Sequence, residues 1–117
     1  LWHNYNTRDG SCIRDYIDVN DLSKLHVLSM SKLDKRKSFI LNCGYNKGYS
    51  VKEIVKIFST IIKTKIKIRY CNKRKGDVKA IYCDNKKLKK IFPNWKREFS
   101  IKTSIQNMIK WEKKSLN

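Results

Sequence analysis

Residues 9 to 21 read Asp-Gly-Ser-Cys-Ile-Arg-Asp-Tyr-Ile-Asp-Val-Asn-Asp, and this stretch combines three structural signals. It opens with an Asp-Gly pair typical of a turn, continues with β-branched residues that indicate an extended segment, and ends in two good helix caps, Asn20 and Asp21. Because side chains alternate along a strand, Arg14, Tyr16 and Asp18 would share one face while the β-branched residues 13, 17 and 19 point into a core. The alternative interpretation is a half-exposed strand whose polar residues are merely solvated.

Strands and helices alternate downstream of this stretch. Hydrophobic spacing predicts helices over 21–33, 51–62 and 86–92 and from residue 101 onward, strands over 39–42 and 65–70, a short extended segment over 80–83 and a polar turn over 35–38. Ser50 and Glu53 have the capping-box spacing, Ser100 is predicted to cap the last helix, and Pro93 to end the short one before it. This order predicts one α/β domain over residues 1–117, with about three strands, four helices and a parallel component.

Three strands make a thin sheet, and a parallel sheet needs cover on both faces. The chain opens at Leu1 with neither a start residue nor a signal peptide. We therefore expect the missing cover to belong to a segment upstream.

The composition is strongly basic, with a formal net charge of +18 from 28 Lys and Arg against 10 Asp and Glu. Such a charge makes nucleic acid or another polyanion a partner to consider. Lys supplies 22 of these cations and Arg only six, whereas recognition of phosphates and base edges favours the forked guanidinium. Because the lysines recur in every segment, a solvated surface is the preferred interpretation, and a small basic nucleic-acid-binding protein is the alternative.

The four cysteines, at positions 12, 43, 71 and 83, and the two histidines do not have the spacing of a zinc site. We expect no metal site, and free thiols suit a reducing compartment such as the cytoplasm. No apolar run approaches the roughly 20 residues that span a bilayer, so we expect no membrane association.

Two arginines stand out in so lysine-rich a chain: Arg14 in the opening strand, and Arg74 in the basic loop over 72–77. An Arg in place of Lys suggests a forked donor pair that grips a phosphate, and both could clamp one diphosphate. Asp77 could accept hydrogen bonds from sugar hydroxyls. The alternative is that Gly76 and Asp77 simply form a turn.

These motifs resemble, in order and spacing, the C-terminal half of the UDP-glucose 4-epimerase family, in the extended short-chain dehydrogenase/reductase superfamily. Tyr16 favours the epimerases over the related dehydratases, which typically have Trp after Arg-Asp. The resemblance covers nearly the whole chain. It is carried by residues 9–17 with Val19, Asp21 and Leu22, by residues 42–51, by Arg-Lys-Gly-Asp at 74–77, and by residues 91–95.

The resemblance implies a substrate-binding part of a Rossmann-like enzyme whose cofactor-binding half is absent from this chain. The family interconverts UDP-glucose and UDP-galactose through a 4-keto intermediate, using NAD that the missing N-terminal region would bind, and a homodimer is expected of the full-length enzyme. Arg14 and Arg74 would bind the diphosphate, Asp77 the ribose, and Tyr16 would line the substrate pocket. A related UDP-sugar epimerase or dehydratase stays an alternative. No catalytic, cofactor-binding or metal residue is expected here, so the chain alone should be inactive.

Two short patterns in the chain resemble the catalytic pair and the cofactor-binding glycine motif of the family. Tyr82 and Lys86 have the Tyr-x-x-x-Lys spacing of the catalytic pair, but they lie across a predicted strand-to-helix junction. Gly44 and Gly48 do not complete a Gly-x-Gly-x-x-Gly fingerprint. The chain also departs from the family at four positions: Asp18 stands where His is common, Ile81 where a larger residue gates the sugar pocket, and Trp2 and His3 replace small residues near the expected uracil-binding loop.

Overall fold

The structure is a computed structural model that describes residues 1–33 and 38–116. Its elements are β1 (Trp2–His3), β2 (Ile13–Asp15), α1 (Val19–Met30), β3 (Gly48–Ser50), α2 (Val51–Ile62), β4 (Cys71–Asn72), β5 (Ala80–Ile81), α3 (Lys86–Ile91) and α4 (Ile101–Ser115). The predicted α/β class and four helices are confirmed. Within residues 1–33 and 38–116 there are five very short strands instead of about three. Most of the turn predicted over 35–38 lies outside the described residues.

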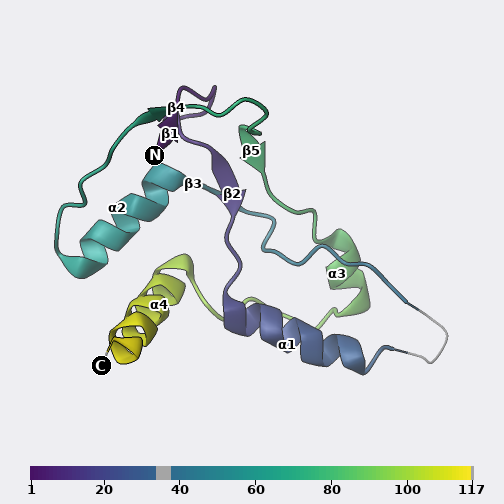
Figure 1. Cartoon of the computed structure of the whole chain (residues 1–117). Coiled ribbons are helices and arrows are strands. Elements are labelled where there is room, and N and C mark those ends of the chain that lie inside the picture. The colour runs from purple at the N-terminus through teal and green to yellow at the C-terminus, as the bar shows by residue number, and fades with distance from the viewer. Residues whose placement is uncertain (34–37, 117) are drawn as a thin grey trace.

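The strands form two small sheets. In one, β1 pairs with β4 in parallel. In the other, β2 is central, antiparallel to β3 and parallel to β5. Figure 1 shows the first sheet at the top of the molecule, at the opposite end from α1. The parallel component predicted from the alternation of elements is therefore present.

The strands predicted over 39–42 and 65–70 are wrong for the described residues. A strand needs a neighbour that completes its ladder of hydrogen bonds. Beside residues 39–42 the structure has a lysine side chain instead, because Lys87 Nζ donates to the backbone oxygen of Ile40 at 2.8 Å. At the end of the second segment only Cys71 and Asn72 find a partner strand.

Local capping signals set the helix starts. The capping box of α2 is present as predicted, with Ser50 accepting from the Glu53 amide and Glu53 from the Ser50 amide. Ser100 caps α4, as predicted. The start of α1 differs: Asp18, rather than Asn20 or Asp21, is the N-cap, so Val19 is the first helical residue.

A hydrophobic core cluster lies between α1 and α3. Leu25, Leu88 and Phe92 are buried there. The predicted apolar face of α2 is less well covered, since the helix contains no buried residue. Val19, predicted to point into a core, is 71% exposed because it is the first residue of α1. The partly buried apolar residues that pack against this cluster are Ile17, Leu41, Cys43, Ile91 and Trp95.

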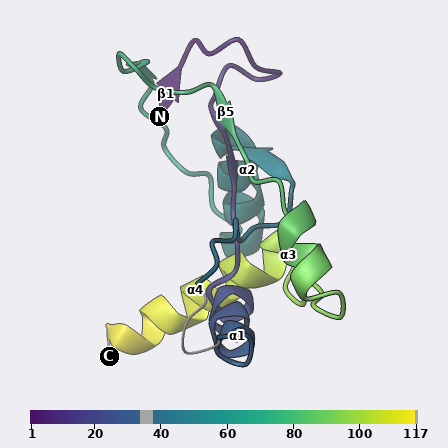
Figure 2. The same ribbon diagram turned by 90° about the vertical axis from the view of Figure 1, so that its right-hand side faces the viewer.

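The molecule is thin and extended, with dimensions of 50 × 39 × 21 Å (Figure 2). Its radius of gyration of 17.1 Å exceeds the ~13 Å expected of a compact domain of this length. Large apolar side chains such as Met30, Ile40 and Trp111 consequently stay exposed. None of the helices in the described ranges has the length and apolar character needed to cross a membrane.

Candidate functional site

The N-terminal segment and the loop between β4 and β5 lie side by side at the top of the molecule (Figure 1). The amino group of Leu1 donates to the Arg69 oxygen at 2.6 Å, and the Cys71 amide donates to the Leu1 oxygen at 2.9 Å. Together with the β1–β4 pairing, these bonds join parts of the chain about 70 residues apart. The two loop residues predicted to bind substrate are thereby brought beside the first strand.

Two aromatic side chains of the N-terminal segment contact the two candidate residues of that loop. The guanidinium of Arg74 lies 3.7 Å from the centre of the Trp2 ring, and the Tyr5 hydroxyl donates to Asp77 Oδ2 at 2.7 Å. The turn of the alternative interpretation also exists, because Gly76 has a φ of +85° and the Asp77 amide donates to the Arg74 oxygen at 3.3 Å. The turn therefore presents both side chains to the same neighbour.

Tyr5 is the buried residue of this arrangement, with 7% of its surface exposed. The hydrogen bond to Asp77 and then burial raise the pKa of Tyr5 to about 12, while the charge of Arg14 opposes the rise. A cation acts in this way only at short range. Arg14 is therefore near enough to Tyr5 to act on its hydroxyl.

Arg14 occupies the middle of the central strand β2, opposite Tyr49 on β3 and beside Ile81 on β5. Its Nη1 donates to the backbone oxygen of Ile13 at 2.7 Å. Burial and the neighbouring Cys12 raise the pKa of Tyr16, and Arg14 again opposes the rise. The charge of Arg14 thus acts on both tyrosines, and the strand register places Arg14 next to Ile81.

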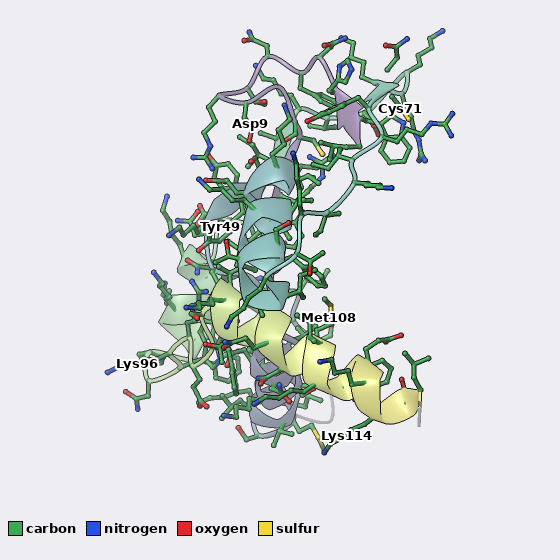
Figure 3. The ribbon with its side chains drawn as sticks, turned by 90° about the vertical axis from the view of Figure 1, so that its left-hand side faces the viewer. Asp9, Tyr49, Cys71, Lys96, Met108 and Lys114 are labelled. Carbon is green, nitrogen blue, oxygen red and sulfur yellow. The ribbon has the colours of Figure 1, made fainter. Side chains whose placement is uncertain are left out.

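A buried polar cluster supports the opening stretch. Asp9 Oδ1 accepts from the amide and hydroxyl of Ser11 at 2.9 and 2.7 Å, and its Oδ2 accepts from the Ser50 hydroxyl. Burial acts to raise the pKa of Asp9, but these hydrogen bonds and the charge of Lys52 outweigh it, so the pKa is lowered. Figure 3 shows Asp9 beside the N-terminal end of α2. The cluster ties the start of β2 to that helix end.

The space beside the two glycines whose spacing resembles a nucleotide-binding loop is occupied by other side chains of the chain. A Cβ at Gly44 would lie 2.6 Å from Asp15 Oδ2 and from Cys83 Sγ, and one at Gly48 would lie 2.4 Å from a methyl of Ile13. These glycines serve close packing and leave no cradle for a pyrophosphate. The described residues around Gly44 and Gly48 therefore do not fit the pyrophosphate of NAD.

The other imitation is also explained by its position. Tyr82 follows β5 and is 56% exposed, whereas Lys86 begins α3 and pairs with Asp84 at 3.4 Å. The two residues do not share a helix turn, as predicted from the sequence. Among the described residues, no group of three His, Cys, Asp or Glu side chains could hold a metal ion.

Sequence reasoning missed the aromatic partners of the loop. In the sequence Trp2 is only a departure from the family pattern, and nothing singles out Tyr5. The available signal was weak: an aromatic residue three positions from another, in a segment just before the Asp-Gly turn. The structure also gives Asp18, which stands where the family commonly has His, a structural role: it is 5% exposed and caps the N-terminus of α1.

Comparison with known proteins returns UDP-sugar 4-epimerases, while no family model matches the sequence. UDP-arabinose 4-epimerase 1 of Arabidopsis thaliana is 41% identical over 110 residues, which cover 93% of this chain and 26% of the relative. UDP-glucose 4-epimerase of Bifidobacterium longum is 36% identical over 113 residues, which cover 97% of this chain and 33% of the relative. The chain thus spans about a quarter to a third of the length of these relatives.

Solved structures agree in fold. The crystal structure of UDP-glucose 4-epimerase from Bifidobacterium longum in complex with NAD+ and UDP matches with a TM-score of 0.89 at 35% identity, over 100% of this chain and 35% of that one. A UDP-glucose 4-epimerase from Stenotrophomonas, with bound NAD and formylated UDP-arabinopyranose, matches with a TM-score of 0.88 at 29% identity, over 98% and 34% of the two chains. The resemblance is confirmed: this chain matches a portion of a UDP-sugar 4-epimerase, and the enzymes it matches were crystallised with NAD.

Proposed function

We propose that this chain is the C-terminal, substrate-binding domain of a UDP-sugar 4-epimerase, spanning residues 1–117, and that it acts together with a cofactor-binding part. The observation that carries the proposal is the loop of Arg74 and Asp77 held against the N-terminal segment, with Arg14 close by. The arrangement holds Arg74 and Asp77 on one turn against the N-terminal segment, and the charge of Arg14 acts on Tyr5 in that segment. Forked cations and a carboxylate suit the phosphate oxygens and the ribose hydroxyls of a nucleoside diphosphate.

Each residue has a specific proposed role. Arg14 and Arg74 bind the diphosphate oxygens with their planar donor sets, and Tyr16 lines the pocket of the sugar. Asp77 binds the ribose hydroxyls; Tyr5 occupies only its Oδ2, which leaves Oδ1 to accept from the ligand. No residue of the chain is assigned a catalytic role.

NAD belongs to the cofactor-binding part in this proposal, because the glycines of this chain are closed by their own neighbours. When bound there, NAD would accept the hydride from C4 of the sugar and return it. Several large apolar side chains are exposed, among them Val27, Met30 and Ile40, which supports docking against such a part. A homodimer of the complete enzyme and a cytoplasmic location, which suits four free thiols, complete the proposal.

The interconverted pair is proposed to be UDP-glucose and UDP-galactose. Because relatives of similar identity include UDP-arabinose 4-epimerases, the pentose pair is the alternative substrate. Ile81, beside Arg14 in the register, is the position at which we expect the two to be distinguished.

The first test is binding by the chain itself. Isothermal titration at about 150 mM salt, where surface charges are screened beyond ~8 Å, compares UDP with an unrelated single-stranded oligonucleotide. We expect UDP to bind and the oligonucleotide to bind weakly and to be released as salt rises. The opposite ranking would favour the basic nucleic-acid-binding alternative.

The second test is activity. The chain is fused to the cofactor-binding part of the Bifidobacterium longum enzyme, and turnover of both UDP-sugar pairs is measured with and without the fusion. We expect turnover only in the fusion; turnover by the isolated 117 residues would contradict the assignment of no catalytic residue. In the fusion, Arg74→Ala should weaken UDP-sugar binding by ~2 kcal/mol, about 30-fold, as loss of a charge-assisted bond does.

The matched control for this variant is Lys73→Ala. It removes one positive charge from the same exposed loop without removing a forked donor. We expect at most a twofold effect, in line with the small worth of exposed charges. Equal effects of the two variants would reduce the role of Arg74 to general electrostatics.

A further inference from the structure

The stacking of Arg74 on Trp2 is closer than a chance contact of two exposed side chains. The guanidinium carbon lies 3.7 Å from the ring centre, well inside the roughly 6 Å within which a cation and an aromatic face attract each other. Trp is the best partner for such a contact. Trp2 itself is 38% exposed, so its ring lies at the surface where a ligand can reach the arginine.

Trp2 is fixed on the same frame that leads into the arginine loop. It pairs with Cys71 across the two parallel strands, and the bonds from the Leu1 amino group to Arg69 and from the Cys71 amide to the Leu1 oxygen hold the backbone just before it. The neighbouring His3 ring packs at 5.4 Å from Tyr70. The backbone that carries the indole is therefore anchored before a ligand arrives.

The far end of the loop is tied by a different contact. Asp77 accepts from the buried Tyr5 hydroxyl, and its amide donates to the Arg74 oxygen across the Gly76 turn. The backbone of the turn is thus held at Asp77. The long side chain of Arg74 is held by Trp2.

Stacking leaves the donors of the arginine free. A guanidinium stacks through its face, whereas its five N–H groups lie in its plane and point outward. An arginine that is already stacked loses less side-chain freedom when its edge takes up two phosphate oxygens. The contact orders the cation without consuming its hydrogen-bonding capacity.

We propose that Trp2 is a positioning residue for UDP-sugar binding, holding Arg74 in the orientation in which it takes the diphosphate. This inference rests on the proposed function, because it needs Arg74 to bind the ligand. It assigns a role to a residue that differs from the small residue expected at this place, and it makes the N-terminal strand part of the binding site.

The test is isothermal titration of the 117-residue chain with UDP. Trp2→Ala should weaken binding about fivefold, the effect of losing one exposed cation–π contact. Trp2→Phe should restore most of the affinity, since a phenyl face still attracts the cation. Trp111→Ala, an equally large truncation at an exposed position on α4, should change nothing.

A double-mutant cycle separates positioning from general structural damage. If Trp2 acts through Arg74, Trp2→Ala has no further effect in the Arg74→Ala background, whereas damage to β1 lowers affinity in both backgrounds. A full effect of Trp2→Ala in the Arg74→Ala background overturns the inference, and so does unchanged affinity in Trp2→Ala when Arg74→Ala is weakened. In both cases the proposed function stands. Absence of UDP binding, or unchanged affinity in Arg74→Ala, overturns the proposed function and this inference with it.

Discussion

The Tyr5 hydroxyl lies 2.7 Å from Asp77 Oδ2 and joins two residues 72 positions apart. The phenol donates, so it must keep its proton for the bond to persist. This bond and burial raise the pKa of Tyr5 to about 12. Because the folded pKa is higher than the unfolded value of about 10, the stabilisation by Tyr5 is fully present below about pH 10. That contribution is lost as the pH rises through about 12.

The first prediction concerns this alkaline range. In urea unfolding followed by circular dichroism, the free energy of unfolding should fall between about pH 10 and pH 12, and Tyr5→Phe should show a smaller fall. Tyr82→Phe, at an exposed position, is the control and should keep the wild-type dependence. Identical curves for wild type and Tyr5→Phe would mean that the bond to Asp77 does not persist in solution.

Asp9 gives the opposite pH dependence. Its pKa is lowered, because hydrogen bonds from Ser50 and Ser11 and the Lys52 charge outweigh the effect of burial. A lowered carboxyl pKa contributes stability above the unfolded value of about 4, and this stability is lost as the pH falls through the folded value. Asp9→Asn should therefore unfold at lower urea near pH 7 and lose less stability than wild type below pH 4.

The control for this acid-side prediction is Asp84→Asn. Asp84 also has a lowered pKa, through its bonds to Lys86, but it is exposed at the start of α3. Its loss should leave the unfolding curve near pH 7 almost unchanged. An equal effect of the two variants would show that the buried cluster around Asp9 contributes no more than an exposed helix end.

The helices could be predicted from the sequence because their signals are local. Ser50 with Glu53, and Ser100 with Thr103, make within four residues the bonds that the spacing predicts. The strands over 39–42 and 65–70 could not be judged in this way, since a strand depends on a neighbour elsewhere in the chain. Local apolar spacing carries no information about that neighbour.

For the candidate site, too, the sequence predicts the residues of suitable chemistry but not the contacts between distant parts of the chain. The resemblance in sequence singled out Arg14, Tyr16, Arg74 and Asp77 as residues of the right chemistry, and their binding roles stay predictions. Their aromatic neighbours Trp2 and Tyr5 could not be inferred, because the contacts bridge about 70 residues and arise from the pairing of β1 with β4.

Gly44 provides a prediction about packing. An alanine Cβ would meet Asp15 Oδ2 and Cys83 Sγ, each at 2.6 Å. Asp15 also accepts from the amides of Tyr45 and Cys83, both at 3.3 Å, so it cannot move without losing these bonds. Gly44→Ala should destabilise the chain by about 2–3 kcal/mol in urea unfolding, the usual cost of overpacking.

Gly76→Ala is the matched control for Gly44→Ala. A Cβ at Gly76 meets nothing within 4 Å, but its φ of +85° strains any other residue. The expected cost is therefore only ~1 kcal/mol. A larger loss at Gly76 than at Gly44 would show that backbone strain, and not side-chain crowding, dominates at these glycines.

The last prediction concerns Asp21, which is fully buried at the first turn of α1. Its Oδ2 accepts from the Tyr45 hydroxyl and from the amides of Glu98 and Phe99, at 3.2 and 3.3 Å for the amides. Asp21→Ala leaves these part-buried donors without their acceptor, which should cost about 2–3 kcal/mol in urea unfolding. Tyr45→Phe removes one donor and leaves the two amides bonded, but it also takes the acceptor from the Asp18 amide, which donates to the Tyr45 hydroxyl at 3.1 Å, so it should cost about 1–2 kcal/mol. Asp21→Ala in the Tyr45→Phe background should then cost less than in wild type, because one stranded donor is gone. Full additivity of the two variants would mean that Tyr45 and Asp21 act independently and would contradict the network.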